Sequence, residues 1–457
     1  MTTLARATAK TDINLVAHLM RRAAFGLPAW RLEEVARKPY EEIVEDLLDI
    51  ERFPRPDEDL LERFLIEHAD EESYHLESKR WIFRMINSQR PLEEKMTLFW
   101  HNRLATAVSK TNNARMMIAH IQMLRNFGMG NYHTLLNRLS RDPAMVWWLD
   151  QEMNHDQDTN ENWGRELLEL FAMGRGNYSE DDVRSAARAF SGWTIEQTIP
   201  RYPNGWYDTN FVYREDDHDH GMKTFLGETG NFNGDDILDI VVRHPATAQF
   251  VASNLHRFFV SDTPDQKAID TLAQAYFDSG YEIRSVLRVL FNSDSFKQSR
   301  FHRVRWPVES VVGTVVLTGE NTDPFELGLD KLDDAAAVMG QELINPPTVE
   351  GWHTGREWID AGYLIQRVNF AAGRFGNVDA PGIKKIIQRI GAGKTSLKAE
   401  TVIEACMYEM GCIDLGSNTR DTMLKELGAT VAVDSSFPKK IAYVLQLAGS
   451  SREYQLG

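Results

Sequence analysis

Residues 160–171 combine carboxylates, amides and an arginine at the spacing of a helix. At about 100° per residue, Asn162, Glu166 and Glu169 fall on one line that borders an apolar stripe. Two carboxylates and an amide beside a buried face could hold a metal ion or serve as acid and base. A capped amphipathic helix with a solvated acidic edge would show the same pattern.

A histidine lies within a predicted helix over residues 92–108. Apolar side chains occupy nearly every face of this helix, so we expect it to be central and buried. A buried imidazole must find a partner or stay neutral. His101 is therefore a candidate general base or metal ligand. The alternative is a core histidine bonded to a carbonyl group or a carboxylate.

Residues 216–220 are five consecutive carboxylate or imidazole side chains, and Lys223 follows them closely. Such a set could bind a divalent cation, with His218 and Asp219 at its centre. The glycine and glutamate positions of an EF-hand loop are not matched. A solvated acidic turn is the alternative.

Residues 346–358 begin with two prolines and contain two glycines and two tryptophans. The prolines stiffen the start of the segment, and the glycines permit a tight return. Trp352 and Trp358 could pack over a cleft or bind a ring-shaped ligand, although packing alone would explain them. The motifs HExxH, GxSxG, CxxC and GxGxxG are absent, so the sequence does not predict the sites that they mark.

Helical periodicity must position these side chains, because it runs through most of the chain and predicts an all-α fold. Ser179, followed three residues later by Asp182, predicts a capping box. Asp235 and Asp236 are suited to cap the next helix. The segments expected to be helical include residues 40–48, 80–87, 114–129, 131–140, 161–174, 179–191, 237–243, 246–260, 284–292 and 307–317.

Residues 197–233 interrupt the helical pattern with two prolines, four glycines and several aromatics. A connection of more than about 15 residues without a helix is usually functional or disordered, and the aromatic content argues against disorder. We expect one long ordered loop or a short hairpin around Asn204-Gly205. Residues 1–363 are expected to form a helical core module, on which residues 364–457 pack as a C-terminal helical segment.

The 457 residues carry 51 Lys and Arg against 67 Asp and Glu, a formal charge of −16. This acidity argues against nucleic acid as the main partner, because a polyanion needs a basic face. With two cysteines, Cys406 and Cys412, the chain has no disulfide scaffold and no four-cysteine zinc module. No apolar run is long enough for a membrane span. Residues 1–14 lack the apolar part of a signal peptide, so we expect a cytoplasmic location.

Seven segments follow one another in a specific order: LMRRAAFG, RPLEEKMTLFWHNRLAT, NENWGRELLELFAMG, ARAFSGWT, HDHGMKTFLG, RHPATAQFVASNL and PPTVEGW. In this combination the chain resembles a bacterial family called domain of unknown function 1800. The resemblance covers nearly the whole chain and implies one helical module. It implies no reaction. Many members look exported, often beside a sulfatase-like partner family, whereas this chain shows no export signal.

The resemblance also implies that polar residues at the matching positions are candidates for catalysis or binding. We expect Trp352 of PPTVEGW to take part in binding as well. The positions carried over are His101, Asn160, Asn162, Arg165, Glu166, Glu169, His218, Asp219 and Lys223.

Two hypotheses remain open. The first is an acid–base or metal-assisted hydrolase-type enzyme, with His101 as base or ligand and Glu166 and Glu169 as acid or ligand. His218 and Asp219 would then cap the cleft, and a divalent ion would be held by His101, Glu166 and His218. The second is a non-catalytic binding or assembly protein whose polar motifs pin the long aromatic loop to the helices. Its partner would be a small molecule, a glycan or a protein.

Overall fold

The computed structural model describes residues 10–57, 59, 61, 63, 73–196, 209–323, 326 and 328–457. These residues are mostly helical, and their named strands form three antiparallel two-stranded sheets. The prediction of an all-α fold is confirmed.

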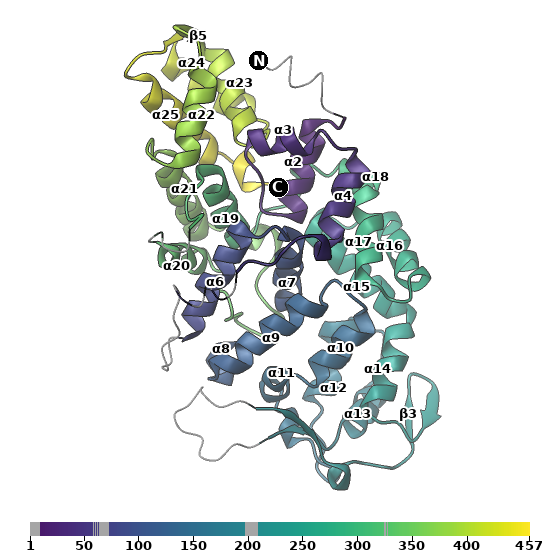
Figure 1. Ribbon diagram of the computed structural model, residues 1–457. Coiled ribbons are helices and arrows are strands. Elements are labelled where there is room, and N and C mark those ends of the chain that lie inside the picture. Colours follow the sequence, from purple (N-terminus) through teal and green to yellow (C-terminus); the bar gives the residue numbers. More distant parts are fainter. Residues whose placement is uncertain are drawn as a thin grey trace.

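The first half of the chain supplies helices that lie along the middle and one end of the molecule (Figure 1). They are α2 (Ile13–Ala23), α3 (Ala29–Val35), α4 (Tyr40–Leu48), α6 (Ser73–Asn87), α7 (Pro91–Arg103), α8 (Val108–Thr111), α9 (Ala114–Phe127), α10 (Tyr132–Ser140), α11 (Pro143–Trp148), α12 (Asn162–Glu166), the π-helix η3 (Leu167–Ala172) and α13 (Glu180–Ala189), with short 3-10 turns η1 (Ile50–Arg52) and η2 (Gln151–Met153).

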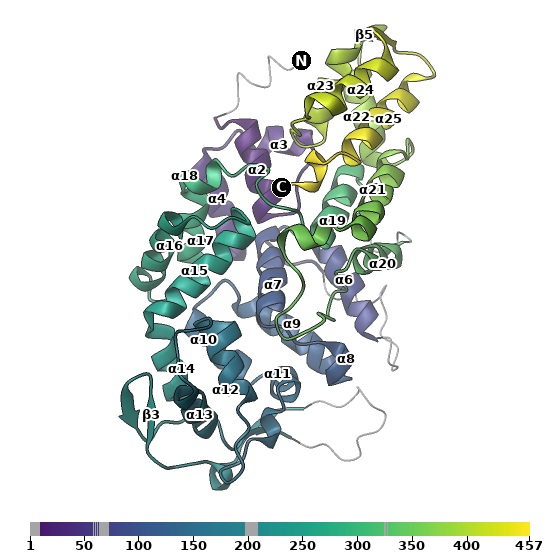
Figure 2. The ribbon, with the colours of Figure 1, turned by 180° about the vertical axis from the view of Figure 1, so that it is seen from behind.

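The second half begins beside the first and ends in a helical stack at the opposite end of the molecule (Figure 2). Its helices are α14 (Gly234–Arg243), α15 (Pro245–Phe259), α16 (Gln266–Asp278), α17 (Ile283–Asn292), α18 (Asp294–Lys297), α19 (Pro307–Thr318), α20 (Leu329–Val338), α21 (Ala361–Phe375), α22 (Pro381–Gly391), α23 (Ala399–Glu409), α24 (Ser417–Leu427) and α25 (Phe437–Gly449), with 3-10 turns η4 (Glu215–Asp217), η5 (Gly355–Ile359) and η6 (Glu453–Gln455).

Local sequence signals start several of these helices. Pro91 occupies the first turn of α7, where its missing N–H costs no hydrogen bond. The capping box of Ser179 and Asp182 is present at α13. At α14 the prediction needs correction, because Asn233 is the cap and Asp236 closes its capping box. The Asn233 side chain reaches the N–H groups that Asp235 and Asp236 expose, which satisfies two orphan donors.

The helix predicted over residues 92–108 is shorter in the structure. It ends at Arg103, because Leu104 leaves the helical region with φ −114° and ψ 52°. The chain then turns and re-forms a helix as α8. Asn102 and Arg103 therefore lie in the last turn of α7, where their side chains are not covered by a further helical turn.

The described part of the predicted excursion, residues 209–233, is built from short hairpins. Strand β1 (Trp193–Ile195) pairs with β2 (Phe211–Tyr213), with Trp193 opposite Tyr213. Strand β3 (Lys223–Phe225) pairs with β4 (Glu228–Gly230) through a two-residue turn in which both residues have positive φ. The turn predicted at Asn204-Gly205 lies outside the described residues. Near the C-terminus, β5 (Ser396–Lys398) pairs with β6 (Thr430–Ala432).

Buried apolar side chains form two clusters. The larger one runs from Val16 to Trp358 and includes Cys412. The smaller one joins residues 371–454 to Leu317 of α19, so α19 belongs to both clusters. The division at residue 363 stays a prediction. Among the described helices, none has the length and apolar character needed to cross a membrane.

Candidate functional site

Glu166 and Glu169 lie where α12 changes into the π-helix η3. Such π-helical turns are rare and often occur at functional sites. Burial, and then the charge of Glu169, raise the pKa of the Glu166 carboxyl. Glu166 has no hydrogen-bond partner among the described residues, whereas Glu169 accepts hydrogen bonds from Arg175 and Tyr178. The pair thus holds one free carboxyl group of raised proton affinity beside an ion-paired carboxylate.

The other polar residues of this stretch build the start of α12. The Asn160 side chain accepts a hydrogen bond of 2.9 Å from the N–H of Asn162. Arg165 pairs with Glu161 at 3.0 Å and with Glu180 at 2.8 Å. These contacts attach α12 to α13.

His101 lies in a fully buried aromatic chamber. Its ring centroid is 5.2 Å from that of Trp352 and 5.7 Å from that of His120. Neither ring nitrogen of His101 has a hydrogen-bond partner, and the Nε1 of Trp352 and the Nε2 of His120 also lack one. Burial, and then the neighbouring His120, lower the pKa of His101 well below its ordinary value. His101 is therefore a neutral imidazole, and the expected carbonyl or carboxylate partner is missing among the described residues.

His218, Asp219 and Lys223 hold the loop against α13. The Nδ1 of His218 lies 2.9 Å from the Ser191 carbonyl oxygen. Asp219 accepts a hydrogen bond of 2.5 Å from the Nε of Arg188. The Nζ of Lys223 donates to the Asp219 carbonyl oxygen at 2.5 Å, and burial lowers the pKa of Lys223. Each of these side chains thus contacts the loop itself or the helix beneath it.

The predicted site residues therefore fall into three separate groups. His101 belongs to the core, Glu166 belongs to the α12–η3 turn, and His218 belongs to the loop. Within the part of the chain that the structure describes, no three His, Cys, Asp or Glu side chains are grouped so that they could hold a metal ion. The predicted ligands are not brought together at one point.

Residues 345–358, here called the strap, connect two of these groups. The N–H of Trp352 donates a hydrogen bond of 2.6 Å to the Oδ1 of Asn102, at the end of α7. Glu350, two residues earlier, lies 3.7 Å from Arg175 and thus beside Glu169. Gly351, between Glu350 and Trp352, has a φ of +88°, and a Cβ added to it would lie 2.0 Å from the Asn102 carbonyl oxygen. The strap is seated on α7 through a contact that only glycine permits.

Next to the strap is a pocket between α7 and α15. Each helix contributes an aromatic, an asparagine and an arginine at positions spaced by three and four residues, which share one face. The Phe99 and Phe258 rings meet at 5.2 Å, and Phe258 meets Trp306 at 4.9 Å. The lining residues are Phe99, Asn102, Arg103, Asn254, Arg257, Phe258, Asp262, Trp306 and Thr354. Aromatic rings, amides and guanidinium groups therefore line this pocket together.

Several polar side chains of this pocket are hydrogen-bond donors without a partner among the described residues. Asn102 is fully buried, and its Nδ2 has no partner. Arg103 and Arg257 have no hydrogen-bond or ion-pair partner among the described residues. Burial, and then the charge of Arg257, lower the pKa of Arg103 to about 10, so Arg103 remains charged at neutral pH. Asp262 is the acid in the lining, and it accepts a hydrogen bond of 3.3 Å from the Val304 N–H.

Sequence reasoning missed this pocket. The usable signal was the pattern of Phe99, Asn102 and Arg103 on one helix face, matched by Asn254, Arg257 and Phe258 on another. A polar pair beside an aromatic at helical spacing is common on helix surfaces. The pairing of these two faces is a fact of tertiary packing.

Comparisons with known proteins give one finding. The family model described as "Protein of unknown function (DUF1800)" matches residues 18–456. Comparison with curated proteins gives no match, and comparison with solved structures gives none either. The resemblance expected from the sequence is confirmed. Because the match spans nearly the whole chain, the protein belongs to the DUF1800 family.

Proposed function

We propose that the protein is a binding protein that holds a small ligand by an oxyanion group, a carboxylate or a phosphate, in the pocket between α7 and α15. The observation that carries this proposal is the set of unpaired donors on Asn102, Arg103 and Arg257. Among the described residues the Nδ2 of Asn102 is buried without a partner, which is costly, and two unpaired guanidinium groups beside it favour an anionic acceptor ligand. This is the binding hypothesis from the sequence, placed at a different site.

The chemistry of the donors indicates the ligand class. A guanidinium group presents N–H donors in a planar fork that matches carboxylate and phosphate oxygens. The cavity volume is about 10 Å³, the room of a single anion oxygen. The rest of the ligand would extend toward Arg257, which is exposed.

The loop contacts support a structural role for the remaining polar motifs. Arg188 and Asp219 pair between α13 and the loop, and the Oγ of Ser185 donates a hydrogen bond of 2.7 Å to the Thr224 carbonyl oxygen. These contacts are those expected if the polar residues pin the loop to the helices. The acid–base hypothesis stays a prediction, favoured by the raised pKa of Glu166.

Isothermal titration calorimetry with two ligand series tests the proposal. One series carries phosphate and phosphate monoesters, and the other carries carboxylates from acetate to hydroxy acids. Asn102→Asp keeps the acceptor for the Trp352 N–H and removes the Nδ2 donor. Arg257→Gln removes an exposed charge at the open side. Each variant is expected to weaken binding by about tenfold to a hundredfold, since a charged hydrogen bond contributes about 1.5–3 kcal/mol.

Arg243→Gln is the matched control. Arg243 is an exposed arginine paired with Glu228, outside the pocket, and its removal should leave affinity unchanged. The series that binds identifies the oxyanion. Equal loss of affinity in the control, or no binding in either series, would refute the proposed site.

A further inference from the structure

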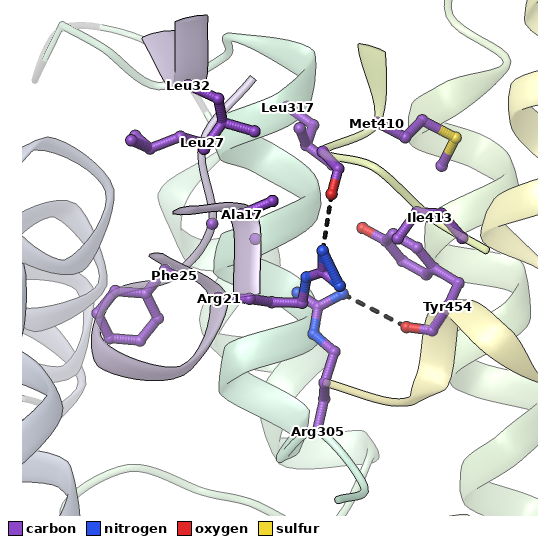
Figure 3. A pocket seen from close by; sticks show the side chains of 13 residues that line it. Ala17, Arg21, Phe25, Leu27, Leu32, Arg305, Leu317, Met410, Ile413 and Tyr454 are labelled. Atoms are coloured by element: carbon purple, nitrogen blue, oxygen red, sulfur yellow. Dashed lines mark hydrogen bonds between the residues drawn. The ribbon is translucent and has the colours of Figure 1, made fainter. Parts of the chain in front are cut away.

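A second cavity lies between α2, α19 and the C-terminal segment (Figure 3). Its volume is about 20 Å³, enough for one small occupant. Most of its wall is apolar side chain and backbone. The polar side chains are those of Arg21, Arg305 and Tyr454, and no acidic residue lines the cavity.

The two guanidinium groups are almost completely removed from solvent. Arg21 is 8% exposed and Arg305 is 6% exposed. The Nη2 of Arg21 donates to the Gly411 carbonyl oxygen at 2.7 Å, but its Nη1 is buried and has no partner. Arg305 donates to the carbonyl oxygens of Tyr454 at 3.4 Å and Glu309 at 2.7 Å. Figure 3 shows both groups meeting at the centre of the cavity.

Carbonyl oxygens do not neutralise these charges. Burial, and then the like charge of Arg305, lower the pKa of Arg21 to about 9, so Arg21 stays a cation at neutral pH. Glu309 follows Arg305 closely in the chain, but its buried carboxylate already forms ion pairs with Lys95 at 2.6 Å and Arg303 at 2.5 Å. Among the described residues no carboxylate pairs with Arg21 or Arg305, and adjacent buried guanidinium groups without a counter-charge are expensive to keep folded.

We propose that this cavity binds a single halide ion, chloride, between the Nη1 of Arg21 and the guanidinium of Arg305. The volume is that of one small ion, and the largely apolar wall suits a monatomic anion better than the several oxygens of phosphate or sulfate. The bound ion would link α2 to the C-terminal segment by neutralising both arginines. This site is separate from the α7–α15 pocket and does not depend on it.

The test is the thermal stability of the full chain in different sodium salts at equal ionic strength. Chloride and bromide should raise the melting temperature by about 2 °C or more over gluconate, with a saturating concentration dependence. Crystals soaked in bromide should show an anomalous peak beside Arg21. No peak, together with equal melting in all three salts, would mean that the cavity holds water and would overturn the proposal.

Variants separate the site from general salt effects. Arg21→Met should abolish the halide dependence, because one of the two cations is gone. Arg300→Met is the control, since Arg300 contacts the same Phe301 ring as Arg21 but pairs with Asp414 at 3.1 Å and does not line the cavity. If Arg21→Met fails to fold, the bromide peak in the unaltered protein still decides the question. Loss of halide dependence in Arg300→Met to the same extent would contradict the assignment.

Discussion

Replacing Glu309 by glutamine should be among the most destabilising single substitutions in this protein. The Glu309 carboxylate is 2% exposed and accepts hydrogen bonds from Lys95 at 2.6 Å and Arg303 at 2.5 Å. It also accepts a bond of 2.8 Å from the Trp306 N–H at the start of α19. Glutamine keeps the shape but turns an amide donor toward two buried cations.

The magnitude follows from the burial of all three charges. Removing one partner of a buried ion pair costs about 3–5 kcal/mol, because the other charge stays buried without compensation. Urea unfolding followed by circular dichroism measures this loss. Glu228→Gln is the control, since its pair with Arg243 is exposed and such pairs contribute about 0–1 kcal/mol.

A double-mutant cycle sharpens the test. If Glu309 and Lys95 are coupled, Lys95→Met combined with Glu309→Gln should destabilise less than the sum of the two single changes. A loss for Glu309→Gln of about 0.5 kcal/mol, the size of an ordinary surface effect, would refute the reasoning.

The pH dependence gives a second check on the same residue. Burial alone would raise the pKa of Glu309, but the charges of Arg303 and Lys95 hold it below its ordinary value. A lowered pKa in the folded state means that the stabilisation is present above the unfolded pKa, about 4.3, and is lost as the pH falls. The advantage of the unaltered protein over Glu309→Gln should therefore shrink by about 1.4 kcal/mol per pH unit below that value.

Three further predictions concern the strap, the chamber and the loop. Gly351→Ala should lower stability by about 1–3 kcal/mol in urea unfolding and weaken oxyanion binding, because its φ of +88° and the close Asn102 carbonyl oxygen leave no room for a Cβ. Because burial lowers the pKa of His101, its imidazole NMR signals should show a neutral ring from about pH 5 to 8 in the folded protein. In acid the unfolded chain binds a proton at His101 that the folded protein does not, so a fall in pH destabilises the fold. A titrating His101 signal would contradict this. Arg188→Met should expose residues 211–222 to limited proteolysis while helical circular dichroism stays unchanged, and protection equal to that of the unaltered protein would argue against pinning by Asp219.

Much of the helical fold was predictable because its signals are local. Residues 40–48 were predicted as a helix and form α4 with those bounds. Pro91 and the Ser179–Asp182 capping box mark helix starts through neighbouring backbone groups alone. The end of α7 and the π-helical turn of η3 were missed. At both places the backbone leaves the regular α-helical conformation, and no proline or glycine stands at that point to predict the change.

The candidate site was less accessible to the sequence, because its parts come from distant segments. Residue types and motif order established the family, the all-α class and the polar residues worth attention. They could not show that aromatic rings enclose His101 or that Asp219 pairs with Arg188. Nor could they show that the faces of α7 and α15 meet over Phe99 and Phe258. Helix periodicity fixes which side chains share a face, whereas packing decides which faces meet. Only that meeting brings together the donors of Asn102, Arg103 and Arg257, which have no partner among the described residues.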